Sequence, residues 1–161
     1  MAVWTDPVFD RTQEDVDFAT QKIAEWIAAD ITGNPLVVYD LKGCLNVSDI
    51  NRIENNIAYL AEQMTRYYYP PDTSTKSWTS VGMPNEKDIS RILYNIRALI
   101  DAFYQQSNAP DIPESMLGYN EVNAVEKNLS LIKELLDSMV NSFRKSGAFY
   151  SGSTMFLPIR R

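Results

Sequence analysis

The stretch that decides the fold is DINRIENNIAYL, Asp49–Leu60, because three other segments of the chain repeat its pattern. Gapless alignment matches it to DVDFATQKIAEW (Asp15–Trp26), DISRILYNIRAL (Asp88–Leu99) and EVNAVEKNLSLI (Glu121–Ile132). In chain order the four copies begin 34, 39 and 33 residues apart. Repetition at such a period is typical of chains built from one recurring structural unit. We therefore expect four related units.

The apolar residues of each copy follow the period of an amphipathic helix. They recur in alternating steps of three and four residues, and further apolar residues beside them widen the stripe. A stripe this wide suits a bundle better than a two-stranded coil. The sequence therefore predicts an all-α fold, a four-helix bundle built from four degenerate one-helix repeats. The four stripes are Val16, Ala19, Ile23 and Trp26; Ile50, Ile53, Ile57, Leu60, Met64 and Tyr67; Ile89, Ile92, Ile96, Leu99 and Phe103; and Val122, Val125, Leu129, Ile132, Leu136, Met139 and Phe143.

Signals for the start and the end of a helix flank each copy. Good N-cap residues stand three positions before the first acid in three copies, and Gly or Pro residues follow the helical pattern. The N-cap positions are Thr12, Asn46, Asn85 and Gly118. The predicted helices lie near residues 13–31, 47–68, 86–107 and 119–145. The predicted parts of the chain are an extended N-terminal arm (1–12), the helical bundle (13–147) and a C-terminal arm (148–161).

The links between the predicted helices are longer than hairpin turns. Their Pro residues favour extended backbone, and LVVYDL (36–41) suits a short strand or an extended crossover. An extended residue covers more than twice the distance of a helical residue, so these links can join parallel as well as antiparallel helices. Of the two arrangements, we expect an up-down-up-down order.

An asparagine recurs at the eighth position of three copies, as Asn56, Asn95 and Asn128, with Lys22 in the first copy. These residues fall beside the apolar stripe, where a buried amide needs hydrogen-bond partners. We expect each amide to bond the backbone of an incoming extended link. The alternative is a row of ligand-binding amides. The third positions are also polar and are interpreted as first-turn structural residues: Asp17, Asn51, Ser90 and Asn123.

The composition excludes several kinds of chemistry. Among 161 residues there is no histidine and a single cysteine, Cys44. This removes histidine-activated nucleophiles, nearly all zinc sites and intramolecular disulfides. The net charge of −6, without clustered Lys and Arg, makes nucleic acid a poor partner. No apolar run is long enough to cross a membrane, and the first residues lack the layout of a signal peptide.

Carboxylates are then the remaining candidates for catalysis. Glu14 with Asp15, or Asp111 with Glu114, could in principle flank a glycosidic bond. However, the first pair sits where first helical turns collect acids, and the second lies in a Pro-rich link. Nothing in the sequence places two carboxylates across a cleft. We therefore expect a protein that is not an enzyme and that uses no cofactor or metal.

Aromatic residues gather in the second link and in both arms. Tyr68, Tyr69 and Trp78 could stack on the sugar rings of a glycan or on a partner protein, and the alternative is that Trp78 pins its link to the bundle. Apolar arms either fold back on their own bundle or dock on a neighbouring chain. The candidate docking residues are Trp4, Phe9, Tyr68, Tyr69, Trp78, Tyr150, Phe156 and Leu157.

NRIENNIAYL (51–60), with its echoes SRILYNIRAL and NAVEKNLSLI, resembles a helical repeat of virion structural proteins. These are small tail, baseplate or fibre-associated proteins of phages and prophages of Gram-positive bacteria. Trp-containing segments often introduce their helical units, as WTDP (4–7) and WTSVGMP (78–84) do here, and FYSG (149–152) resembles their closing segment. The likeness spans residues 4–152. The fourth position of the repeat is arginine in the second and third copies, Arg52 and Arg91. The first and fourth copies depart from this pattern with Phe18 and Ala124.

The resemblance implies a non-catalytic structural or assembly protein of a phage or phage-derived particle, in its tail, baseplate or fibre attachment. Its partners would be other structural proteins of the particle and further copies of itself. Such a protein would be made in the bacterial cytoplasm and would reside in the virion or particle. A host-surface glycan-binding module is the alternative function, and a carboxylate glycosidase is the weakest hypothesis.

Overall fold

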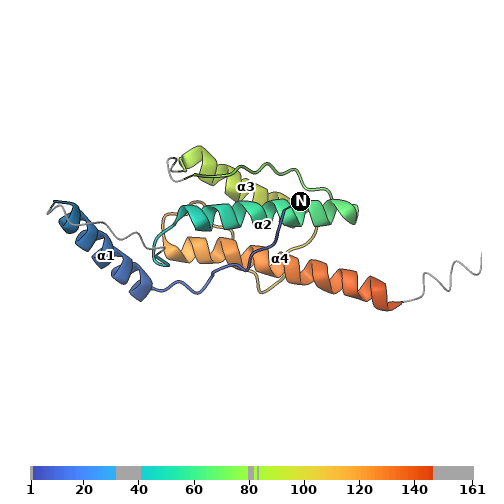
Figure 1. Cartoon of the computed structure of the whole chain (residues 1–161). Helices are drawn as coiled ribbons and strands as arrows, with labels where there is room; N and C mark the ends of the chain where they lie inside the picture. Colours follow the sequence, from blue (N-terminus) through green and yellow to red (C-terminus); the bar gives the residue numbers. More distant parts are fainter. Residues whose placement is uncertain (1, 32–40, 80–81, 83, 147–161) are drawn as a thin grey trace, which may run out of the picture.

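The computed structural model describes residues 2–31, 41–79, 82 and 84–146, and within them the fold is all-α. Four helices pack together, and the described residues form no strand (Figure 1). The helices are α1 (Gln13–Ile31), α2 (Val47–Arg66), α3 (Glu86–Ala102) and α4 (Tyr119–Ser146). All four starts agree with the sequence prediction. None of these helices combines the length and the apolar character needed to cross a bilayer.

The helix starts use the predicted capping residues. The Asn85 side chain accepts hydrogen bonds from the backbone N–H groups of Lys87 and Asp88, and Asp88 accepts one from the Asn85 N–H in return. Thr12 and Asp15 form the same reciprocal pair at the start of α1. Each capping box satisfies N–H groups that have no partner within the helix.

Two helices end earlier than predicted, for different local reasons. After α2, the Tyr69 N–H reaches the Met64 carbonyl and the Tyr68 N–H reaches the Thr65 carbonyl, which is the Schellman pattern. After α3, the backbone leaves the helical conformation at Phe103, whose ring packs edge-on against Tyr69 at 5.2 Å between ring centroids. The predicted stretch from 103 to 107 is therefore not helical.

The core consists of the predicted apolar stripes of α2, α3 and α4. Burying these side chains together removes apolar surface from water and is the main favourable contribution to the fold. The buried core residues are Ile50, Ile53, Ile57, Leu60, Met64, Ile92, Leu93, Ile96, Leu99, Met116, Val122, Val125, Leu129, Ile132 and Leu136. The stripes predicted for the second, third and fourth copies are thus confirmed, except that Phe143 at the end of the fourth stripe is 52% exposed.

The helices α2, α3 and α4 run parallel, so the expected up-down-up-down order is wrong (Figure 1). Near their starts, Arg52 of α2 bonds Glu126 of α4, and Arg91 of α3 bonds Glu54 of α2. At the other end, Tyr69 after α2 meets Phe103 after α3. The links return to the starting end in extended form, which needs fewer residues than a helix of the same length.

The first repeat contributes little to the common core. Of its predicted stripe, Ala19 is buried, Val16 and Trp26 are half-buried, and Ile23 is 38% exposed. α1 joins the rest at its first turns, where a Cβ on Gly43 would lie 2.0 Å from the Asp15 carbonyl oxygen. The predicted equal role of α1 in the bundle is therefore not observed, and the LVVYDL segment lies almost wholly outside the described residues.

The unequal packing predicts unequal losses of stability. Ile96 is fully buried, so Ile96→Ala should lower the free energy of unfolding by about 2–5 kcal/mol. Ile27 on α1 is 58% exposed, so Ile27→Ala should change it by less than about 0.5 kcal/mol. Urea denaturation of both variants measures these values. Equal losses would show that α1 is packed as tightly as α3.

Candidate functional site

Two buried asparagines hold the extended segments by their backbone, as predicted. Asn56 of α2 accepts a hydrogen bond from the Thr5 N–H at 3.0 Å and donates one to the Thr5 carbonyl at 2.8 Å. Asn95 of α3 likewise accepts a hydrogen bond from the Ser74 N–H at 3.1 Å and donates one to the Ser74 carbonyl at 2.7 Å. Both asparagines are 0% exposed. Each amide therefore binds both backbone groups of one residue of the chain, an arrangement that we call the asparagine clamp.

The third clamp is incomplete because its link residue is proline. The Asn128 side chain donates to the Pro110 carbonyl at 3.0 Å, but Pro110 has no N–H to return. The Asn128 Oδ1 atom is accordingly buried without a hydrogen-bond partner. The expectation that the three eighth-position amides bond incoming links is confirmed, with one of the two possible bonds missing at Asn128.

The third-position residues do more than the sequence indicated. Asn51 of α2 forms a two-bond clamp on Trp78, and Asn123 of α4 forms one on Arg11. Ser90, which is the third-position residue of α3, shows no corresponding bond. The N-terminal arm therefore lies between α2 and α4, and the second link lies between α2 and α3.

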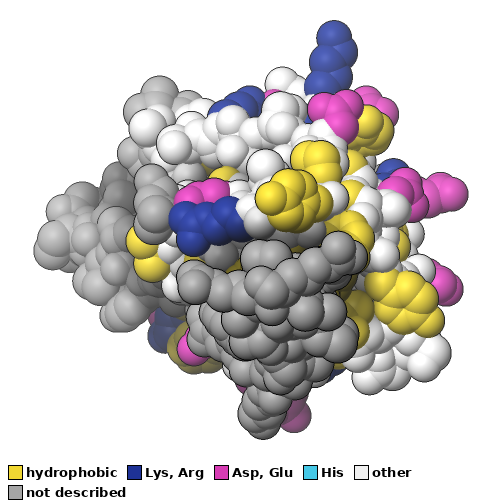
Figure 2. Space-filling view, turned by 90° about the vertical axis from the view of Figure 1, so that its right-hand side faces the viewer, with side chains coloured by type: hydrophobic (Ala, Val, Ile, Leu, Met, Phe, Trp, Pro, Cys, Tyr) yellow, Lys and Arg dark blue, Asp and Glu magenta, His cyan; other side chains and the backbone are white. Residues whose placement is uncertain are grey.

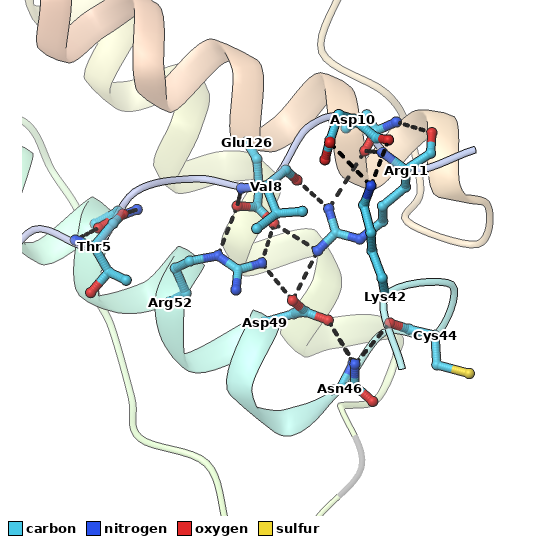
Figure 3. Close-up of polar contacts among 12 residues, drawn as sticks. Thr5, Val8, Asp10, Arg11, Lys42, Cys44, Asn46, Asp49, Arg52 and Glu126 are labelled. Atoms are coloured by element: carbon cyan, nitrogen blue, oxygen red, sulfur yellow. Dashed lines mark hydrogen bonds and ion pairs between the residues drawn. The ribbon is translucent and has the colours of Figure 1, made fainter. Parts of the chain in front are cut away.

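Four charged residues meet where the N-terminal arm crosses the helix starts (Figure 3). Arg11 of the arm bonds Asp49 at 2.9 Å and Glu126 at 3.0 Å. Arg52 also bonds Glu126, through Nε at 2.9 Å and through a terminal nitrogen at 2.7 Å. Glu126 accepts a further bond from the Val8 N–H at 2.6 Å. Two cations balance two carboxylates, so this buried cluster carries no net charge.

The pairing repeats around the bundle in a threefold manner. The fourth-position arginine of one helix bonds the sixth-position glutamate of its neighbour, as Arg52 does with Glu126 and Arg91 with Glu54. For α4 and α3 the same positions hold Ala124 and Leu93, so both charges are absent from that pair. The departure of Ala124 from the arginine pattern is thus matched by a departure at Leu93.

The environments of Arg52 and Cys44 favour a structural role over a reactive one. Burial opposes the Arg52 cation, but hydrogen bonds to Glu126 and Asp49 outweigh this effect and raise the pKa of Arg52. Burial and the charge of Asp49 raise the pKa of Cys44, which disfavours the reactive thiolate. Within the described residues, no cluster of three or more Cys, Asp or Glu side chains is arranged to hold a metal ion.

The predicted carboxylate pairs do not face each other across a cleft. Asp15 bonds the Thr12 N–H, which is the largest of the influences that lower the pKa of Asp15, and Glu14 lies exposed beside it in the first turn of α1. Asp111 and Glu114 are exposed in the third link. Neither pair has the enclosed geometry that raises the pKa of a general acid.

Three of the candidate docking residues act within the chain. Trp4 packs against Tyr59 at 5.7 Å between ring centroids and is covered by Lys133. Trp78 donates from Nε1 to Glu54 at 3.1 Å, and its backbone is clamped by Asn51. The Lys127 ammonium lies 4.6 Å from the centroid of the Phe9 ring. The N-terminal arm thus folds back on its own bundle, and Trp78 pins its link.

Tyr68 and Tyr69 lie at the opposite end from Trp78, where α2 and α3 finish. Figure 2 views this end and shows hydrophobic side chains on its surface. Tyr68 is 93% exposed and has a φ of 69°. A residue with a Cβ is strained by roughly 1 kcal/mol or more in this left-handed conformation. Tyr150, Phe156 and Leu157 lie outside the described residues.

Four exposed aromatic residues mark what we call the finishing end of the bundle: Tyr68, Tyr69, Tyr104 and Phe143. Tyr104 and Phe143 come from the third link and from the last turns of α4. The sequence contained a signal for them, since each follows or ends an apolar stripe. Without the parallel order, however, nothing in the sequence brings the ends of three helices together.

The clamp predicts a graded loss of stability among asparagines. Asn95→Ala should lower the free energy of unfolding by about 2 kcal/mol, because the Ser74 N–H loses its partner and the Ser74 carbonyl keeps only the bond from Arg91. Asn128→Ala removes the bonds to the Pro110 and Ala124 carbonyls together with an unpartnered buried oxygen, so the loss should be about 1 kcal/mol. Asn55 is the neighbouring asparagine of α2 and is exposed, so Asn55→Ala is the matched control. Denaturant unfolding that ranks Asn55→Ala with Asn95→Ala would contradict the clamp.

The absent third ion pair predicts a non-additive double variant. Arg91→Ala should lower the free energy of unfolding by about 3–5 kcal/mol, because Glu54 stays buried without its cation. Adding Glu54→Leu copies the alanine and leucine of the α4–α3 pair and should recover part of that loss. A double-mutant cycle measured by chemical denaturation tests this. A double variant less stable than Arg91→Ala alone would contradict the threefold correspondence.

Comparison with known proteins assigns the chain to no family. No family model, no curated protein and no solved structure matches it.

Proposed function

We propose that this chain is a non-catalytic structural or assembly protein of a phage or phage-derived particle, acting in the tail, the baseplate or the attachment of a fibre. It works by docking on other structural proteins of the particle and on copies of itself. The repeat that resembles virion structural proteins motivates the class of particle. The geometry supports docking as the mode of action.

One observation carries the proposal, the exposed tyrosine at the finishing end. Tyr68 is kept in a strained backbone conformation that glycine would adopt without strain. Tyr68 is 93% exposed, and backbone hydrogen bonds hold the Schellman turn without any contribution from its side chain. Aromatic side chains in exposed, rigid positions are the usual anchors of protein interfaces. A strained tyrosine in this position is best explained by a partner that binds it.

The chemistry-bearing groups elsewhere support the same class. The buried carboxylates Asp49, Glu54 and Glu126 are bonded to arginines of the chain, and the buried asparagines hold its links. The contacts of these groups within the chain therefore favour a structural role for them. The glycan alternative receives less support, because Trp78 and Tyr68 lie at opposite ends of α2 and form no shared stacking platform.

The proposal predicts a variant that is more stable but less able to assemble. Tyr68→Gly relieves the left-handed strain, so the free energy of unfolding should rise by about 1 kcal/mol. Because the anchor is lost, the amount of the variant in purified particles should fall at least about tenfold relative to the unchanged chain. Quantitative mass spectrometry of particles from cells that carry each form measures this.

Tyr94 provides the control. It is exposed on α3 away from the finishing end, and Tyr94→Ala should leave incorporation unchanged. Absence of the unchanged chain from purified particles would contradict the proposed function. Undiminished incorporation of Tyr68→Gly would contradict the assignment of the anchor.

A further inference from the structure

The first helix presents an apolar face that no described part of the chain covers. Ile23 and Ile27 are 38% and 58% exposed, and Ala24 and Ala28 beside them are also exposed. These four residues recur at helical spacing, so they form one continuous strip, which we call the α1 face. The counterparts of Ile23 in the other three repeats are buried in the core, as Ile57, Ile96 and Leu129, whereas those of Ile27 are half-buried, as Ala61, Ile100 and Lys133. A strip of this kind on one repeat out of four indicates a docking surface.

The α1 face is bordered by negative charge. α1 contains five carboxylate residues and one lysine, Lys22. Asp17 and Glu25 are exposed on this helix. Two such helices would repel each other, so pairing between the α1 helices of two copies is disfavoured. The surface instead suits an occupant that is apolar and positively charged.

The C-terminal segment of this chain has that chemistry. No Asp or Glu follows Asp137, whereas Arg144, Lys145, Arg160 and Arg161 do. Between the two basic pairs lie large apolar residues: Phe149, Tyr150, Met155, Phe156, Leu157 and Ile159. The segment therefore combines apolar side chains with positive charge, which complements the α1 face in both respects.

The reach of the chain assigns the contact to a second copy. α1 lies beyond the end where α4 begins, and residue 147 follows the other end of α4 (Figure 1). A helix of 28 residues is about 42 Å long, by the rise of 1.5 Å per residue. Fifteen residues span at most about 50 Å when fully extended. The segment would spend about 42 of its about 50 Å in returning along its own α4, which leaves too little chain to cover the α1 face of its own copy.

We propose that residues 147–161 of one copy dock on the α1 face of the next copy, with Arg160 and Arg161 beside the carboxylates Asp17 and Glu25. The contact joins two different surfaces, so it links copies head to tail into a ring or an open row. The inference rests on the proposed function, for which it names the partner as a second copy of the chain.

Two full-length variants separate the halves of the contact. Ile23→Asp with Ile27→Asp places charge on the α1 face, and Arg160→Glu with Arg161→Glu reverses the charge of the segment. Each should weaken self-association at least about tenfold, as measured by sedimentation at low salt. Leu117→Asp is the control, because Leu117 is 94% exposed and lines another acidic, apolar hollow with Glu86 and Glu114. It should leave self-association unchanged.

Mixing the two defective variants gives the decisive result. One keeps a working segment and the other keeps a working α1 face, so the mixture should form one-to-one dimers although neither variant associates alone. Adding Asp17→Lys and Glu25→Lys to the charge-reversed segment variant should restore self-association to within about threefold. Circular dichroism checks that every variant keeps its helices.

The proposal would be overturned by the absence of self-association in the unchanged chain, by loss of association in Leu117→Asp, or by the absence of a dimer in the mixture. Association lost on changing α1 but kept on reversing the segment would indicate pairing between α1 helices and would also overturn it. These results are independent of particle incorporation, so a failure here leaves the proposed function to its own test.

Discussion

The hydrogen bonds between buried asparagine amides and the backbone of extended segments are the constraint on which the rest of the fold depends. A parallel arrangement of α2, α3 and α4 requires each link to return along the bundle, and a returning link has backbone N–H and C=O groups that need partners. Asn95 supplies both partners to Ser74 of the second link, and Asn56 supplies both to Thr5 of the extended N-terminal arm. The same bonds satisfy the asparagine amides, which would otherwise be buried without partners. Helix packing and link position are thus fixed together.

The charged residues reinforce this arrangement at the end where the helices begin. Arg52 and Arg91 tie each helix to its neighbour, and Arg11 ties the N-terminal arm to the same cluster. Buried ion pairs add little net stability, but removing one partner is strongly unfavourable, so they favour one register over its alternatives. The α4–α3 pair, with Ala124 and Leu93, shows that the arrangement also accepts an apolar version of the tie.

The helices, their caps and the asparagine clamp could be predicted from the sequence because each depends on local spacing. Asn85 with Asp88 is a capping signal within four residues, and Asn56 falls beside an apolar stripe whichever way the helices run. The parallel order could not be predicted, since extended links allow both directions. The position of α1 was also missed, although Lys22 in place of the asparagine and Phe18 in place of the arginine are the residues that distinguish it. Within the described residues, α1 therefore lacks both the asparagine clamp and the arginine–glutamate pair that tie α2, α3 and α4 to their neighbours. The finishing end, with Tyr68 and Tyr104, follows from the parallel order and was missed with it.

Amide hydrogen exchange followed by NMR tests the clamp most directly. The N–H groups of Thr5, Arg11, Ser74 and Trp78 lie outside helices, yet each donates to a side-chain oxygen of an asparagine on α2, α3 or α4. The account predicts that these four amides exchange as slowly as those of the α2–α4 core, through opening of the bundle as a whole. Exchange of these amides at the rate of an unstructured chain, while the helices stay protected, would contradict it.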